Sequence, residues 1–151
     1  MRYSVLFTLL FVFSSCFSQT QKQNNNCITF GILQGGGSLI GADLEFLVTK
    51  KISFQVGAGL VGYGYGINYH LEPSIKSSFF SLQYWNQGFN NSFAQNVIGT
   101  TYVYRGEKWF TAQLGLGKTL EKGPAWPNNL EQPKVILLYS IGLYIPYKTQ
   151  Q

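Results

Sequence analysis

Apolar residues alternate with small or polar residues through most of the chain. The longest such run is 135–147, in which the odd-numbered positions form an unbroken apolar row and the other face carries Ser140 and Gly142. The segments 38–48 and 52–60 follow the same period of two. Because successive side chains of a β-strand point to opposite faces, this pattern predicts strands that each have one apolar face.

The alternation and its interruptions predict eight strands. A single strand over 51–71 would be about 70 Å long at ~3.3 Å per residue, far more than a bilayer core requires, so we expect a turn near Val61 and Gly62. The apolar positions also change there from even to odd numbers. The predicted strands are 27–34, 38–48, 51–60, 63–71, 76–86, 96–104, 108–119 and 134–147.

The connections between these strands fall into two groups. Three are tight and charged, at 49–51, 72–76 and 105–108, and two are long and polar, at 86–96 and 121–134. Eight antiparallel strands place the tight turns at one end of the sheet and the long loops at the other. The glycines at 35–37 lack the residues of a phosphate-binding loop, so we interpret them as a flexible strand connection.

The composition decides which face points outward. Charged residues make up only 11% of the 151 residues, against about 25% in soluble domains. The polar strand faces carry mainly Gly, Ser, Thr, Gln and Asn, which suit a packed interior, whereas the continuous apolar faces suit lipid. We therefore predict an all-β, antiparallel up-and-down transmembrane barrel. The alternative is a soluble periplasmic lipocalin-like binding barrel, which has the same strand count and period.

Aromatic residues gather near the tight-turn ends of the predicted strands, where rings prefer the membrane interface. We expect an aromatic girdle formed by Tyr69, Tyr102, Tyr104, Trp109, Phe110 and Tyr147.

The N-terminal segment predicts export. Arg2 precedes an apolar stretch over 5–13 and small residues up to Ser18, so we interpret 1–18 as a signal peptide. Lipidation of Cys16 is the alternative processing route. Residues 19–26 are then a flexible lead-in, and cleavage after Ser18 would leave Cys27 without a disulfide partner.

The predicted barrel, 27–147, resembles the small eight-stranded outer-membrane β-barrels of Gram-negative bacteria, the class of the OmpA membrane domain and OmpX. In particular, the stretch 140–147 is similar to the C-terminal signal read by the barrel-assembly machinery. The resemblance implies that Ser140, Gly142, Ile145 and Tyr147 are the recognition positions. It also implies an outer-membrane location, with lipid, lipopolysaccharide and the assembly machinery as partners. Pro146 and the tail 148–151 depart from the usual pattern.

The interior of an eight-stranded barrel is filled by side chains, so a general diffusion pore is not expected. Asp43 and Glu45 lie on the polar face of their strand and would point into the lumen. Buried carboxylates need partners, and we expect a network with Tyr, Gln, Asn or Arg105. A proton or ion path is the alternative.

His70 is the only histidine, on the inward face near Glu72 and Ser74. A Ser–His–acid arrangement would permit lipid hydrolysis, which makes a lipid-modifying enzyme the alternative function. No motif of such enzymes is present, so we expect a structural histidine in a non-enzymatic protein without a cofactor or metal.

The remaining candidates lie on the surface. The basic residues form no stripe, so nucleic-acid binding is not expected. Lys118, Lys122 and Lys134 either contact lipopolysaccharide phosphates or are ordinary solvated loop charges. Trp126, in the proline-containing loop 121–134, is the candidate contact residue. We therefore predict a monomeric barrel with a structural or loop-mediated role.

Overall fold

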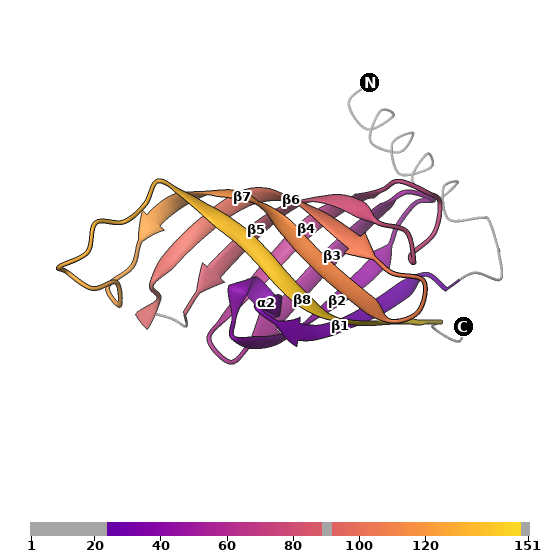
Figure 1. Ribbon diagram of the computed structural model, residues 1–151, viewed down its shortest axis with the longest axis horizontal. Helices are drawn as coiled ribbons and strands as arrows, with labels where there is room; N and C mark the ends of the chain where they lie inside the picture. The colour runs from indigo at the N-terminus through magenta and orange to yellow at the C-terminus, as the bar shows by residue number, and fades with distance from the viewer. Residues whose placement is uncertain (1–23, 89–91, 149–151) are drawn as a thin grey trace, which may run out of the picture.

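A computed structural model describes residues 24–88 and 92–148 as one closed barrel of eight antiparallel strands. Each strand pairs with its neighbour in the chain, and β8 returns to pair with β1 (Figure 1). The predicted all-β, up-and-down architecture is confirmed. The expected signal segment 1–18, with Cys16, lies outside the described residues, as do most of the lead-in and residues 149–151 of the tail.

The strands lie close to the positions that alternation predicted. The turn between the third and fourth strands occupies residues 60–61, one residue before the predicted position, and it joins the paired Gly59 and Gly62. The elements are β1 (Asn26–Ile32), α2 (Gln34–Gly37), β2 (Ile40–Leu47), β3 (Ile52–Gly59), β4 (Gly62–His70), β5 (Phe79–Gln87), β6 (Gln95–Arg105), β7 (Phe110–Lys122) and β8 (Val135–Tyr147).

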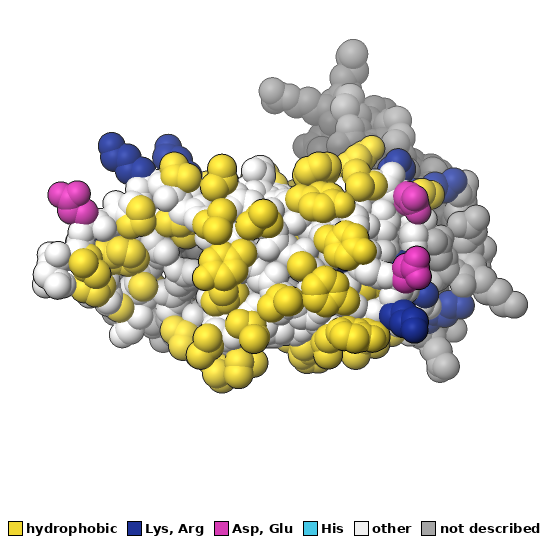
Figure 2. All heavy atoms as spheres, viewed as in Figure 1, with side chains coloured by type: hydrophobic (Ala, Val, Ile, Leu, Met, Phe, Trp, Pro, Cys, Tyr) yellow, Lys and Arg dark blue, Asp and Glu magenta, His cyan; other side chains and the backbone are white. Residues whose placement is uncertain are grey.

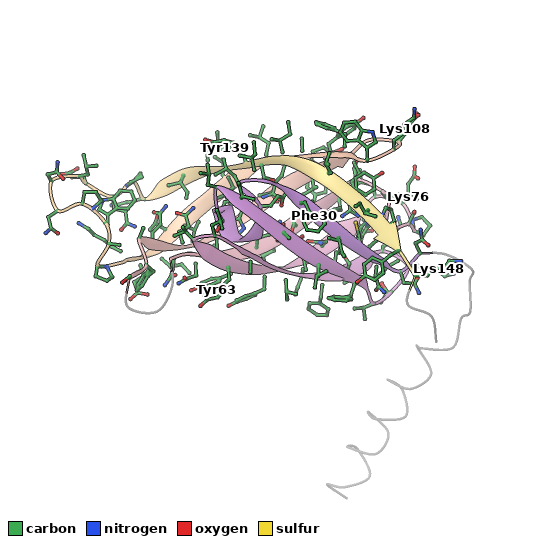
Figure 3. The ribbon with its side chains drawn as sticks, turned by 90° about the horizontal axis from the view of Figure 1, so that it is seen from below. Phe30, Tyr63, Lys76, Lys108, Tyr139 and Lys148 are labelled. Carbon is green, nitrogen blue, oxygen red and sulfur yellow. The ribbon has the colours of Figure 1, made fainter. Side chains whose placement is uncertain are left out.

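The two ends of the barrel differ, as predicted. The connections 48–51, 71–78 and 106–109 lie at the end where the described chain starts and stops, and the 123–134 loop extends from the opposite end (Figure 1). We call these the tight-turn end and the long-loop end. Lys76, Lys108 and Lys148 gather at the tight-turn end (Figure 3).

The wall of the barrel is not equally tall on all sides. β2 and β3 have 8 residues each, whereas β7 and β8 have 13. β8 pairs with β1 through Ile141–Tyr147 and with β7 through Val135–Leu143. The ends of β7 and β8 toward the long loops therefore extend beyond the ends of the shorter strands β2 and β3.

The strands point their apolar residues outward. Figure 2 shows hydrophobic side chains over the middle of one face, with charged side chains near its two ends. Tyr63 and Tyr139 project away from the barrel (Figure 3). The exposed apolar rows include Leu44 and Phe46 on β2, Phe54 and Val56 on β3, Tyr65 and Ile67 on β4, Leu114 and Leu116 on β7, and Leu137, Tyr139, Ile141 and Leu143 on β8.

The glycines at 35–37 connect β1 to β2, as expected, but they are packed inside the barrel, which corrects the expectation of a flexible connection. They form the short turn α2, in which Gly35, Gly36 and Gly37 have positive φ angles of 64°, 82° and 76°. α2 is buried against β2, β3, β4 and β5. A Cβ on Gly36 would collide with the backbone carbonyl of Tyr63. Glycine is required because only a residue without a side chain fits this close approach at positive φ.

Two small hydrophobic clusters fill the lumen near its ends. Cys27, Ile75 and Tyr144 pack together with Leu47 near the tight turns. Trp85, Val97 and Leu138 pack together with Ile136 toward the long loops, on the side where α2 contacts β5. Polar side chains occupy the space between these clusters, including Gln83 and Gln113. Side chains thus occupy the lumen at several levels.

Candidate functional site

The outer wall is the largest apolar surface of the molecule. Its rows of exposed aliphatic and aromatic residues run across all eight strands, and the inward rows are mainly polar or glycine, apart from the residues of the two lumenal clusters. In a soluble barrel the alternation would be reversed, because apolar residues would fill the interior. The observed arrangement is typical of barrels that cross membranes and does not favour a lipocalin-like binding barrel.

Rings form a belt on the outer wall near the tight-turn end. The Phe80 and Tyr102 ring centroids are 5.3 Å apart, and Phe110 lies 6.4 Å from both Tyr104 and Trp109. Tyr69 and Tyr102, which pair with Phe80 from either side, are also exposed. This belt includes five members of the predicted girdle and adds Phe80, which was not among the predicted residues. Tyr147, the sixth, ends β8 at the same end of the barrel.

Glu45 is the centre of a buried polar network in the lumen. Its side chain is 2% exposed, and its Oε1 accepts hydrogen bonds from Ser53 Oγ (2.5 Å) and Asn68 Nδ2 (2.8 Å). Ser81 Oγ donates in turn to Asn68 Oδ1 at 2.5 Å. These partners come from β3, β4 and β5, whose polar faces the alternation placed inward. The network therefore ties four consecutive strands together.

Arg105 supplies the opposite charge from the far side of the lumen. Its Nη2 donates to Glu45 Oε2 at 2.5 Å, and its Nη1 donates to the backbone carbonyl of Ile75. The guanidinium carbon lies over the rings of Phe79 and Tyr144, 4.8 Å and 5.0 Å from their centroids. Aromatic ring faces attract the planar guanidinium, and this attraction is stronger when the cation is desolvated. This arrangement joins the 71–78 turn to the lumenal network.

Asp43 is also buried in the lumen, and Gln55 connects it to this network by hydrogen bonding to Asp43 and accepting a hydrogen bond from Asn68 Nδ2 at 3.1 Å. It is 5% exposed, and its Oδ2 accepts a hydrogen bond from the backbone N–H of Gly35 at 3.3 Å. Because Gly35 belongs to α2, Asp43 helps to hold the inward turn in place. The two acidic residues predicted to face the lumen thus belong to one polar network, in which Glu45 pairs with Arg105 and Asp43 also holds α2.

His70 does not have the geometry of a catalytic base. Its side chain is fully buried, and its Nε2 lies 3.0 Å from both Ser53 Oγ and Glu45 Oε1. Its Nδ1 faces the carbonyl of Ser77 at 3.3 Å. In a catalytic triad the serine and the acid face different ring nitrogens. Here they share one nitrogen inside a closed lumen, so the lipid-modifying enzyme is not favoured.

The two long loops contact each other. Ala125 N donates to Phe93 O at 3.1 Å, and Gly123 N donates to Ala94 O at 2.8 Å. Trp126 is half-buried, and its indole N–H donates to Leu130 O at 3.0 Å. The candidate contact residue therefore braces its own loop, while Leu130 is exposed beside it. Contact between the loops depends on strand order, which makes it hard to infer from either loop alone.

The four positions of the C-terminal signal lie on the strand that closes the barrel. Ser140 is buried in the lumen, and Ile145 is exposed on the outer wall. Gly142 pairs with Gly31 across the β1–β8 seam, and a Cβ on Gly142 would collide with the carbonyl of Phe30. Tyr147 pairs with Asn26 at the end of the seam. Gly142 thus has a packing reason for being glycine, besides its place in the motif.

The described part of the chain contains no group of three or more His, Cys, Asp or Glu residues that could hold a metal ion. No helix within residues 24–88 and 92–148 is long and apolar enough to cross a membrane.

A closed eight-stranded barrel with an apolar outer wall and a polar lumen defines the class, an outer-membrane-type β-barrel. Among solved structures, the chain is similar to the N-terminal β-barrel domain of Pseudomonas aeruginosa OprF. The two share 19% sequence identity over 83% of this chain and 100% of that domain, with a TM-score of 0.39. No family model and no curated protein matches the sequence.

Proposed function

We propose that this protein is a monomeric, non-enzymatic barrel of the bacterial outer membrane that acts through its long-loop end. The observation that carries the proposal is the inverted alternation, in which every strand turns its apolar row outward. Transferring this wall to lipid removes apolar surface from water and leaves the polar rows enclosed. The exposed belt of rings near the tight turns supports the same placement.

The filled lumen supports a role other than general diffusion. The cluster around Ile75 and Tyr144 occupies one end, and α2 with the cluster around Trp85 occupies the other. Between them, Gln83 and Gln113 donate hydrogen bonds to each other across the lumen at 3.2 Å. An eight-stranded barrel has about enough interior for its side chains. We infer that the barrel is a scaffold that holds the joined loops above the membrane.

The orientation of the proposed barrel follows from its two ends. Outer-membrane barrels have short turns on the periplasmic side and longer loops outside. The joined segments 92–94 and 123–134 would then face the exterior, where exposed loops commonly carry binding functions. Trp126 would stabilise the second loop through its bond to Leu130, and the exposed residues around it would make the contact.

The experiment is to express the full chain, fractionate the cells and run isolated membranes on SDS gels before and after boiling. A folded barrel that resists extraction by salt and alkali and changes mobility on heating is the expected result. Planar-bilayer recordings of the purified protein should show no steady large conductance. Recovery in the periplasmic fraction would refute membrane residence, and a large steady pore would refute the scaffold role.

A further inference from the structure

The half of β8 nearer the long loops has a neighbouring strand on one side only. β7 pairs with β8 over Val135–Leu143, whereas β1 pairs with it only over Ile141–Tyr147. Beyond that ladder β1 leaves the wall, because Leu33 turns at a φ of 59° into the inward turn α2 (Figure 1). No other strand of the described residues pairs with this side of β8. We call the stretch Val135–Tyr139 the free edge.

The main-chain groups of the free edge point away from β7 at alternate residues. Tyr144 N donates to Trp109 O at 2.7 Å, so the even-numbered residues of β8 direct their N–H and C=O groups toward β7. The β7–β8 register has no shift, so odd-numbered residues direct theirs to the opposite side. Within residues 24–88 and 92–148, no group hydrogen-bonds to the N–H or C=O of Leu137 or Tyr139 on that side.

The free edge belongs to the apolar outer wall. The side chains of Val135, Leu137 and Tyr139 are exposed there, while Leu138 is buried inside the barrel. In a membrane this wall faces hydrocarbon, where open sheet edges are not tolerated, because acyl chains offer no hydrogen-bond partner to N–H and C=O groups. A lipid therefore cannot satisfy the edge. An added β-strand can, because it presents donors and acceptors at the matching spacing.

The position beside the free edge, in line with β1, is bordered by apolar side chains. Leu33 N donates to Leu39 O at 3.3 Å, which places Leu39 where β1 ends. Leu60, in the neighbouring turn, donates its N–H to Ile40 O at 3.0 Å. Leu39 and Leu60 are 67% and 66% exposed, the highest values among the large hydrophobic residues of the described chain. An apolar occupant at this position would cover such a surface.

A second copy of this chain cannot supply the missing strand. β8 runs from the long-loop end to the tight-turn end, and copies inserted in one membrane all run it in the same direction. An antiparallel ladder between two β8 strands would need one barrel to be inverted. A parallel ladder with both apolar faces toward lipid would set the free edge of one copy against the β7-paired edge of the other. The occupant is therefore a strand of another protein.

We propose that a membrane-embedded β-strand of a different protein adds to the free edge of β8. The strand runs antiparallel to β8 and lies in line with β1, beyond Ile32. Its outward residues are apolar, beside Leu137 and Tyr139, and its inward residues are small, because α2 contacts β8 behind this position. The proposal rests on the membrane residence proposed above and adds a docking surface within the wall to the role of the loops.

The first test uses proline to remove single N–H groups from the purified full-length barrel in detergent. Leu137→Pro removes an N–H of the free edge, whereas Leu138→Pro removes one that bonds to β7. Leu137→Ala and Leu138→Ala report on loss of the side chains alone. The heat-modifiable band should persist equally in Leu137→Pro and Leu137→Ala but be lost in Leu138→Pro relative to Leu138→Ala. Loss of the band in Leu137→Pro relative to Leu137→Ala would mean that the edge is engaged within the barrel and would overturn the proposal.

The second test looks for the partner strand in intact cells of the source organism. The photoreactive residue p-benzoylphenylalanine replaces Tyr139 or, as a control, Tyr65 on the opposite wall, which are 53% and 55% exposed. Irradiation should join Tyr139, but not Tyr65, to one other protein. Adding Leu137→Pro should lower this product at least about fivefold relative to Leu137→Ala, the equivalent of about one backbone hydrogen bond.

The remaining outcomes decide against the partner strand. A product that is unchanged by Leu137→Pro would mean a contact that does not use the edge. A product with a second copy of this chain, the same product from Tyr65, or products with lipid alone would each overturn the proposal. Extraction of the wild type by alkali would refute membrane residence, whereas the proline comparison in detergent still reports on the edge, so the two failures are distinguishable.

Discussion

Arg105 and Glu45 face each other across the lumen from β6 and β2, strands that lie four positions apart in a ring of eight. Their 2.5 Å contact spans the barrel rather than linking neighbouring strands. Around it, Ser53 and Asn68 satisfy the second oxygen of Glu45. A buried charge that keeps such partners is tolerated, whereas one that loses its counter-charge is strongly destabilising.

Glu45→Gln should therefore lower the free energy of unfolding by about 3–5 kcal/mol, because Arg105 would remain buried without its counter-charge. Urea unfolding in lipid vesicles, followed by tryptophan fluorescence, measures the change. Glu107→Gln, in an exposed turn, should shift stability by less than ~0.5 kcal/mol. The double variant Glu45→Gln with Arg105→Met should be more stable than Glu45→Gln alone. Additive losses would contradict the cross-lumen pair.

The outer wall gives a prediction that separates lipid from water as its surroundings. Leu114, in the middle of β7, and Leu130, in the long loop, are 59% and 53% exposed. Leu114→Arg should cost about 2–4 kcal/mol if this surface faces hydrocarbon, and Leu130→Arg should cost less than ~1 kcal/mol. Unfolding in vesicles measures both. Similar small costs would mean that the wall faces water.

The inward turn α2 depends on glycine. Gly36→Ala places a side chain at a φ of 82° against the Tyr63 carbonyl, so we expect a loss of at least about 2 kcal/mol. Gly106→Ala is the matched control, because the nearest atom to its added Cβ lies 3.4 Å away and its φ is not positive. Equal stability of the two variants would show that the close packing of α2 is not required.

Tyr147→Ala tests whether the last strand is read during assembly. The barrel-assembly interpretation predicts several-fold less folded protein in outer membranes, with unchanged refolding of the purified chain into detergent. Tyr139→Ala, on the same outward row of β8, is the control and should accumulate normally. Loss of refolding in both settings would assign Tyr147 to stability rather than to recognition.

Much of the fold could be predicted from the sequence because strand alternation is local. Residues two apart share a face, so the outward rows, the strand count and the inward placement of Asp43 and Glu45 follow from neighbouring positions. The fifth strand begins at Phe79 rather than at the predicted residue 76. The preceding turn, 71–78, instead buries Ile75 at the tight-turn end of the barrel. That contact joins Ile75 to Cys27 and Tyr144 from both ends of the chain, and no local pattern encodes it.

Contacts between residues far apart in the sequence also account for the parts of the candidate site that could not be predicted. A run of three glycines has no periodicity and no side chains, so nothing in it distinguishes a flexible loop from a turn packed inside the barrel. The partners of Glu45 required the register of four strands, although Arg105 was one of the candidates. Asn86 was within the polar segment 86–96, but only strand pairing places it beside Asn96.

Two groups of residues obstruct the lumen, one near each end of the barrel. A solute crossing the barrel would have to pass the cluster of Ile75 and Tyr144 and, separately, the turn formed by Gly35–Gly37, so the less permeable of the two sets the leak. Disrupting either one leaves the other as a barrier. In the membrane-resident barrel that we propose, movement at the loop end would therefore leave the cluster of Ile75 and Tyr144 as a barrier to solutes.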